Sequence, residues 1–181
     1  MIYKTLVTSI LGVAMLGACE TGQGLDAQTD MLLGEASPVA PASQSLAASC
    51  AGNDLLQQQM MDAVNAARAT QGKTILEIDP LLVEIAQSHA CDIAAMGQAS
   101  VAGSNGSSVV DRARAVGYPT CGVTQLVAIG GSADGVVAGW GRSKPHSVEL
   151  LSQMSEQVGA GVVQGADGRL WWSVVLGENC T

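Results

Sequence analysis

Two histidines are the first candidates for chemistry in this chain: His146, in the stretch RSKPHSVELL, and His89, in the stretch AQSHACD. An imidazole acts as a general base near neutral pH or as a zinc ligand, usually with carboxylates or other ligands beside it. His89 shares its expected helical face with Leu82, Ile85 and Ile93, which favours a packed histidine over a ligand. His146 is therefore the candidate on which an enzymatic reading depends.

Nucleophilic and phosphate-binding motifs are absent from the sequence. No G-x-S-x-G stretch occurs, and the Gly-rich runs AGSNG and IGGSADG lack the following lysine of a phosphate loop. Serines in such loops more often make turns than catalyse reactions, and this interpretation covers Ser104, Ser107, Ser108 and Ser132. No cysteine is expected to be free as a thiolate nucleophile.

The first nineteen residues have the layout of a bacterial lipoprotein signal. Lys4 precedes an apolar run, residues 6–16, which is too short to span a bilayer. The ending Leu-Gly-Ala-Cys resembles a lipobox, in which the thiol of Cys19 takes up the lipid. The alternative is ordinary secretory cleavage that leaves Cys19 free. We expect a signal peptide over residues 1–18, a lipidated cysteine with a disordered tether over 19–49, and a folded domain over 50–181.

Four cysteines remain once Cys19 is assigned to lipid: Cys50, Cys91, Cys121 and Cys180. An even number in an exported domain predicts two disulfides, and the absence of a C-x-x-C pair argues against a zinc ribbon. The sequence allows three pairings. We favour Cys50–Cys180, which would tie the two ends of the domain, together with Cys91–Cys121.

Composition excludes two classes of function. The formal net charge of −8 opposes binding to nucleic acid, which needs a basic surface. No run of 18 apolar residues occurs, so no membrane-spanning helix is expected in the mature protein. Aromatic residues make up only 3% and phenylalanine is absent, so the core must be built from aliphatic side chains, methionine and three tryptophans.

The pattern of the folded region predicts helices followed by a strand pair. Helices are expected over residues 54–70, from Pro80 to Gly97 after an N-cap at Asp79, and from about Ser108 to Gly117. Further helical segments cover residues 132–140 and 146–154. A strand is expected over 123–129 and a hairpin around QGADGR. The order indicates an α+β domain with an antiparallel sheet. Arg112 and Arg114 are interpreted as the solvated side of the third helix.

The order of these pieces resembles the bacterial branch of the CAP superfamily, the SCP-like extracellular domains. The stretches VNAARATQGKTILEIDPLLVEIAQSHACDIAAMG, GSNGSSVVDRARAVGY and GVVAGWGRSKPHSVELL are similar to successive family segments. SEQVGAGVV and LWWSVVLG are similar to its two closing strands. The resemblance covers about Val64 to Leu176 and implies a three-layer α-β-α sandwich.

The resemblance also implies where a functional site would lie. Many family members carry two histidines and two acidic residues around a cleft that in some holds a divalent metal. Here Val101 stands in the place of the first histidine and Thr124 in the place of the first glutamate. The segment from Trp140 to Ser143 has no acid, and only the second histidine remains, as His146. A GEN triplet at residues 177–179 is interpreted as a C-terminal turn after the last strand.

This degenerate tetrad leads us to expect no metal, no cofactor and no catalytic residue. We favour a hydrogen-bonded structural role for His146, with contact to a cleft ligand or to a metal as the alternatives. The favoured function is a lipid-anchored envelope protein that acts by binding. The alternatives are a hydrolase with an atypical site around His146 and a carrier of sterol-like or fatty ligands. Glu20 after Cys19 favours the outer membrane.

Overall fold

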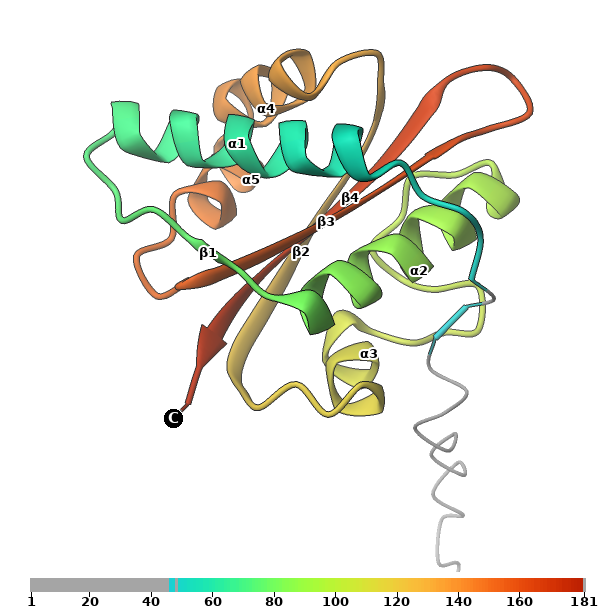
Figure 1. Ribbon diagram of the computed structural model, residues 1–181, viewed down its shortest axis with the longest axis horizontal. Coiled ribbons are helices and arrows are strands. Elements are labelled where there is room, and N and C mark those ends of the chain that lie inside the picture. The colour runs from blue at the N-terminus through green and yellow to red at the C-terminus, as the bar shows by residue number, and fades with distance from the viewer. Residues whose placement is uncertain (1–45, 48, 181) are drawn as a thin grey trace, which may run out of the picture. The chain divides into compact units, whose positions relative to one another are not determined.

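The computed structural model describes residues 46–47 and 49–180 (Figure 1). The predicted signal peptide, Cys19 and most of the tether therefore lie outside the described residues. The elements, in chain order, are α1 (Asp54–Thr70), β1 (Glu77–Ile78), α2 (Pro80–Met96), α3 (Val109–Ala115), β2 (Thr120–Gly130), α4 (Ala133–Arg142), α5 (Lys144–Leu150), β3 (Gln157–Gln164) and β4 (Leu170–Asn179). Among the described residues, no helix is long and apolar enough to cross a membrane.

The strands form a sheet of order β1-β3-β4-β2. β4 pairs antiparallel with both β2 and β3, as the predicted hairpin requires. β1 joins the outer edge of β3 in parallel through Glu77 and Ile78, because the chain runs along this edge between α1 and α2. The predicted antiparallel strands are present, and β1 adds a short parallel strand at one edge, so the sheet is mixed.

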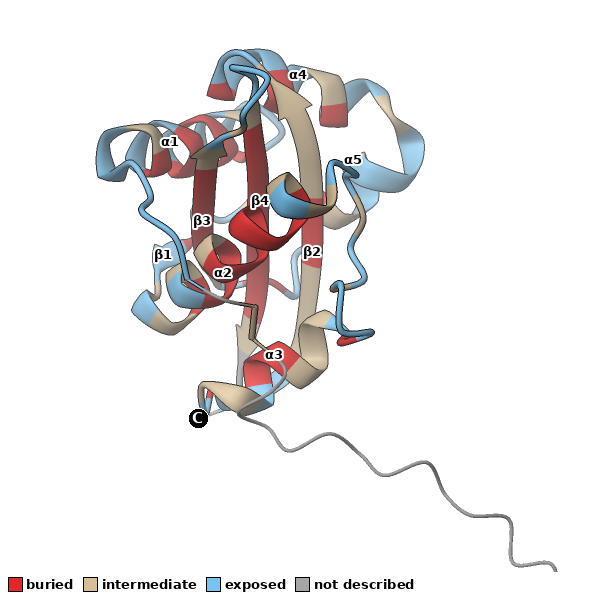
Figure 2. Ribbon diagram, turned by 90° about the vertical axis from the view of Figure 1, so that its right-hand side faces the viewer, coloured by how far each residue is buried: buried red, intermediate tan, exposed pale blue. Residues whose placement is uncertain are grey.

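Helices cover both faces of the sheet, which confirms the three-layer α-β-α sandwich (Figure 2). On one face, α1 and α4 pack on strand residues such as Leu126 and Val174. On the other, α2 and α3 pack on Val175, with Val123 at the margin of that cluster. Because side chains alternate across a strand, even-numbered residues of β2 and β4 face the first layer and odd-numbered residues the second.

The ends of the helices follow the capping residues that the sequence offers. The Asp79 side chain accepts hydrogen bonds from the N–H groups of Leu81 and Leu82, and Pro80 occupies the first turn of α2. Gly97 ends α2 with a φ of 66°, in the left-handed region that glycine favours. The expected bounds of α1 and α2 are thus confirmed.

Two glycines allow α2 to lie directly on β3. A Cβ added at Gly159 would come within 2.1 Å of the Leu82 carbonyl carbon. A Cβ added at Gly161 would come within 2.3 Å of the Ala86 carbonyl carbon. The neighbouring atoms belong to backbone and not to flexible side chains. The absence of a side chain at these two positions therefore sets the distance between the helix and the sheet.

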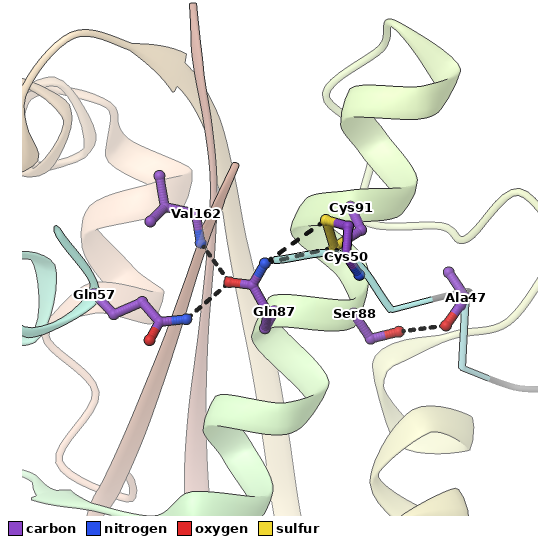
Figure 3. The surroundings of a disulfide bond; sticks show 7 residues. All are labelled: Ala47, Cys50, Gln57, Gln87, Ser88, Cys91 and Val162. Carbon is purple, nitrogen blue, oxygen red and sulfur yellow. Dashed lines mark hydrogen bonds between the residues drawn. A yellow bond between two sulfur atoms is a disulfide. The ribbon is translucent and has the colours of Figure 1, made fainter. Parts of the chain in front are cut away.

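The disulfides are Cys50–Cys91 and Cys121–Cys180, so both predicted pairings were wrong. Cys121 is the second residue of β2 and Cys180 follows β4, and these antiparallel neighbours bring the two cysteines to a Cα–Cα distance of 5.4 Å. Cys50 precedes α1 and lies against α2 beside Cys91 (Figure 3). The prediction assumed that the two ends of the domain meet. Instead, the first end is bonded to α2 through Cys50–Cys91, and the last is bonded to β2 through Cys121–Cys180.

The Gln87 side chain joins the first disulfide to the sheet (Figure 3). Its amide nitrogen lies 3.4 Å from the Cys91 sulfur. Its oxygen accepts hydrogen bonds from the Gln57 side chain at 2.8 Å and from the Val162 N–H at 3.0 Å. One half-buried amide therefore links α1, α2 and the outer edge of β3.

β4 is longer than the sequence indicated. Gly177 and Glu178 pair with Val123 and Gly122 of β2, so the GEN triplet belongs to the strand and is not a turn after it. The close approach of Tyr118, whose oxygen would lie 2.3 Å from a Cβ at Gly177, requires glycine there. β2 likewise spans residues 120–130 and not only 123–129.

Candidate functional site

Val101 and Thr124, the two positions that replace family tetrad residues, come together at one hollow beside β2. The hollow has a volume of about 350 Å³. Its remaining walls come from the loop before α3, from the start of α3 and from neighbouring β2 residues. They are Ala102, Gly106, Ser107, Ser108, Val109, Val123 and Gln125. We call this space the β2 hollow; its character is apolar with a few hydroxyl and amide groups.

A buried arginine stands directly behind the β2 hollow. Arg112 is only 1% exposed and donates hydrogen bonds to the Val101 carbonyl, to the Ser107 carbonyl and hydroxyl, and to the Gln125 side-chain oxygen, at 2.5–2.9 Å. The prediction that Arg112 is solvated was wrong, because its side chain turns inward under the loop. Arg114, with a side chain 71% exposed, is on the solvated side as expected.

The arginine is part of a polar network that crosses the layer between α2 and the sheet. The side-chain amide of Gln125 extends the network, because it donates a hydrogen bond to the Ser173 hydroxyl at 2.8 Å. Asp92, on α2, accepts a hydrogen bond from the Ser104 N–H, also at 2.8 Å, and its negative charge raises the pKa of Arg112. Burial has the larger effect and lowers that pKa to about 10, so the guanidinium keeps its positive charge at neutral pH.

His89 is fully buried in this layer, which confirms its interpretation as a packed side chain. Its Nε2 lies 2.7 Å from the Ser100 carbonyl oxygen and must therefore carry the proton that is donated. Nδ1 has no hydrogen-bond partner within residues 46–47 and 49–180. Burial, followed by the positive charge of Arg112, lowers the pKa of His89 to about 4. The imidazole is accordingly neutral at physiological pH and holds the loop by one hydrogen bond.

The neutral state of His89 predicts a loss of stability in mild acid. The unfolded chain binds a proton at His89 below its ordinary pKa of 6.5, whereas the folded chain does so only below about 4. The contribution of neutral His89 to the free energy of unfolding is therefore fully present above pH 6.5. It falls as the pH drops towards 4, by about 3 kcal/mol over the whole window. Urea unfolding between pH 7 and 4 should show this slope. In His89→Gln the slope should shrink, and an unchanged slope would contradict the assignment.

His146 does not join Val101 and Thr124. It lies exposed on α5, does not line the β2 hollow, and forms no side-chain hydrogen bond with any described residue. The prediction of a hydrogen-bonded structural role was therefore wrong. His146 lies in the first turn of α5, whose residues 144–146 are all exposed, whereas the helix is buried only at its last residue, Leu150.

A comparison with models of known protein families identifies the family of this chain. The family model described as "CAP: Cysteine-rich secretory protein family" matches residues 61–176. This chain belongs to the CAP family. The matched range agrees with the stretch from Val64 to Leu176 that carries the sequence resemblance. A comparison with curated proteins gave no match.

Among the solved structures that are similar to this CAP domain are three bacterial proteins. An outer surface protein of Borrelia burgdorferi has 18% sequence identity and a TM-score of 0.62, over 67% of this chain and 91% of the other. An extracellular protein with an SCP domain from Bacillus anthracis has 21% identity and a TM-score of 0.61 over 70% of this chain. A cysteine-rich secretory protein of Staphylococcus aureus has 17% identity and a TM-score of 0.58, also over 70% of this chain. The CAP domain spans 41% and 39% of the last two chains.

A second hollow lies on the opposite face of β2 in this CAP domain. It has a volume of about 150 Å³, and two carboxylate-bearing residues, Glu149 of α5 and Glu178 of β4, are among those that line it. The others are Gly122, Val123, Thr124, Ser152, Met154, Ser155 and Leu176. We call this space the acidic hollow. In the described part of the chain, no three His, Cys, Asp or Glu residues come close enough together to hold a metal ion.

Sequence reasoning located the β2 hollow through its replaced residues but missed what lies around it. Arg112 was interpreted as solvated and Gln125 was not singled out, although the D-R step of the third helix offered a signal for Arg112. Glu149 and Glu178 were missed because they come from separate elements. Only the sheet and α5 bring these two carboxylates to the same hollow.

Proposed function

We propose that this protein is a lipid-anchored CAP domain of the bacterial cell envelope that acts by binding and not by metal-dependent catalysis. The observation that carries the proposal is the guanidinium of Arg112, buried directly behind the hollow that Val101 and Thr124 line. A buried positive charge beside the hollow disfavours the binding of a divalent cation there. The alternative of a hydrolase around His146 has no support in the site, because that imidazole is solvated and away from the hollow.

The residues at the two replaced tetrad positions, Val101 and Thr124, also argue against a metal site. Valine offers no ligand atom, and the threonine hydroxyl is a weak neutral donor compared with the carboxylates and imidazoles that zinc prefers. A cation in the β2 hollow would exchange its hydration shell for uncharged groups beside a positive charge. The hollow is instead suited to a guest that brings apolar groups and main-chain hydrogen bonds.

A second candidate, the carrier of a fatty or sterol-like ligand, is favoured by a separate apolar groove. This groove, of about 470 Å³, lies between α1, α4 and α5. Its walls are mostly small apolar residues, among them Ala63, Ala66, Ala67, Val137 and Ala138. Organic extraction and mass spectrometry of protein purified from its native host test this candidate. A stoichiometric lipid would promote the carrier over the favoured function.

The anchor gives a direct prediction. Wild-type protein should incorporate an alkyne-labelled palmitate and fractionate with membranes, because several acyl chains on one cysteine give stable anchoring. Cys19→Ala should lose the label and become soluble. For this variant, residues 1–18 are replaced by an ordinary cleavable leader, so that an uncleaved signal cannot hold the chain in the membrane. A soluble, unlabelled wild type or a membrane-bound Cys19→Ala would refute the anchor.

A further inference from the structure

β2 is the end strand of the sheet, and only one of its edges is paired. It matches β4 residue by residue from Gly122 to Gly130. The other edge has no strand beside it in the described part of the chain. Figure 2 shows β2 at the margin of the sheet, with α5 and the loop before α3 near it.

The register reveals which peptide groups face this open edge. The Val162 N–H points away from β4, because it donates to Gln87 at the outer edge of β3. Trp172, directly opposite Val162, must then point its own N–H and C=O towards β2, where Ala128 is its partner. Ala128 therefore faces β4. Since peptide groups alternate along a strand, the even-numbered residues of β2 face β4 and the odd-numbered residues face outward.

Four residues of β2 thus present their N–H and C=O groups to the open edge: Val123, Gln125, Val127 and Ile129. None of these peptide groups has a hydrogen-bond partner among the described residues. Native proteins usually protect such an edge with charged residues or proline. The sequence of β2, TCGVTQLVAIG, contains neither. An open ladder of this length is a template for another strand.

The two hollows flank the open edge at the same height. Both include Val123 and Thr124, but they lie on opposite faces of the sheet: the β2 hollow on the α2 side and the acidic hollow on the α5 side. Successive side chains of a strand added to β2 would point alternately to these two faces. One side chain would meet the valines of the β2 hollow, and the next would meet Glu149 and Glu178.

We propose that the outer edge of β2 binds an extended peptide as an added strand, with an apolar side chain in the β2 hollow and a lysine or arginine in the acidic hollow. Main-chain hydrogen bonds would provide affinity and the two hollows would provide selectivity. The inference rests on the proposed binding function, for which it names the class of partner. A second copy of β2 fits less well, because β2 carries no basic residue to meet the two carboxylates.

Amide hydrogen exchange of the folded domain tests the pairing directly. In the free protein, the amides of Val123, Gln125, Val127 and Ile129 should exchange fast and those of Thr124, Leu126 and Ala128 slowly. Saturating amounts of the synthetic peptide SVKVKVS should slow the first set by at least about tenfold, since each gains a hydrogen bond. The peptide SVEVEVS should bind far more weakly. Binding of SVKVKVS without protection of the odd-numbered amides, or no binding at millimolar concentration, overturns the proposal.

Two pairs of variants test separately the open edge of β2 and the carboxylates of the acidic hollow. Val127→Pro removes an outward N–H without touching the ladder to β4 and should weaken SVKVKVS binding by about tenfold. Val127→Ala, which keeps the N–H, should bind nearly as wild type does. Glu178→Lys should weaken binding strongly, whereas Glu84→Lys, an equal charge change on exposed α2 surface, should not. Equal effects within either pair overturn the proposal.

The outcomes also distinguish this proposal from the proposed function. Cleavage of a bound SVKVKVS peptide, seen by mass spectrometry, would refute the non-enzymatic function and leave the docking edge supported. A co-purified lipid together with no peptide binding would refute the docking edge and leave a binding function. Protection of the odd-numbered amides that rises with protein concentration, without peptide, would assign the edge to a second copy and overturn the proposal.

Discussion

Gly161→Ala is expected to destabilise the domain by at least about 3 kcal/mol, because it forces a methyl group into a backbone contact. The added Cβ would lie 2.3 Å from the carbonyl carbon and oxygen of Ala86. α2 cannot move away locally, since Gly159 makes the same kind of contact one helical turn earlier and Gln87 ties α2 to Val162. A loss of this size is a large share of the total stability of a small domain.

Urea unfolding of the purified variant measures this effect. Gly139→Ala is the matched control, because Gly139 lies within α4 and a Cβ there would meet no atom within 4 Å. Alanine has the higher helix propensity, so the control should be stabilised by up to about 1 kcal/mol. A Gly161→Ala domain as stable as wild type would show that α2 does not lie on β3 at this distance.

Arg112→Met should cost about 3–5 kcal/mol and release the loop that walls the β2 hollow. Methionine replaces part of the volume but leaves the oxygens of Val101, Ser107 and Gln125 without their donor, and the bonds to Ser107 and Gln125 are buried. It also leaves Asp92 without its positive neighbour in a buried setting. Arg112→Lys should recover little of this, since one ammonium cannot reproduce the fork of a guanidinium.

Arg114→Met is the control, since it removes an arginine from the same helix whose side chain is 71% exposed. Its expected effect lies within about 0.5 kcal/mol. Hydrogen exchange should show faster exchange of the Ser104 and Ser107 amides in Arg112→Met but not in Arg114→Met. Two variants of equal stability would contradict the assignment of Arg112 as the residue that holds the loop.

The sequence was sufficient to predict those parts of the fold that depend on local signals. The Asp79-Pro80 step and Gly97 mark the ends of α2 through capping and a left-handed residue, both properties of a few neighbouring positions. The hairpin between β3 and β4 follows in the same way from a turn between apolar runs. The parallel partner β1 has only two residues and carries no periodic signal of its own.

Features that depend on through-space neighbours were not predictable from the sequence. The count of cysteines predicts two disulfides, but the pairing depends on which strand ends meet in the sheet. Arg112 follows an acidic residue on a short helix, as solvated arginines often do. Only the fold brings four acceptors to it, three from the loop before α3 and one from Gln125 of β2. His146 occupies a family position in sequence, yet it lies exposed in the first turn of α5 and away from Val101 and Thr124.

Calorimetric titration of the folded domain with Zn²⁺ at neutral pH tests the central claim, that this CAP domain has no metal site. We expect no specific binding and no shift in melting temperature at saturating Zn²⁺, since a ligand that binds the native state must stabilise it. His146→Ala should titrate as wild type does. A one-to-one site of micromolar affinity that disappears in His146→Ala would contradict the account and restore a metal-dependent function.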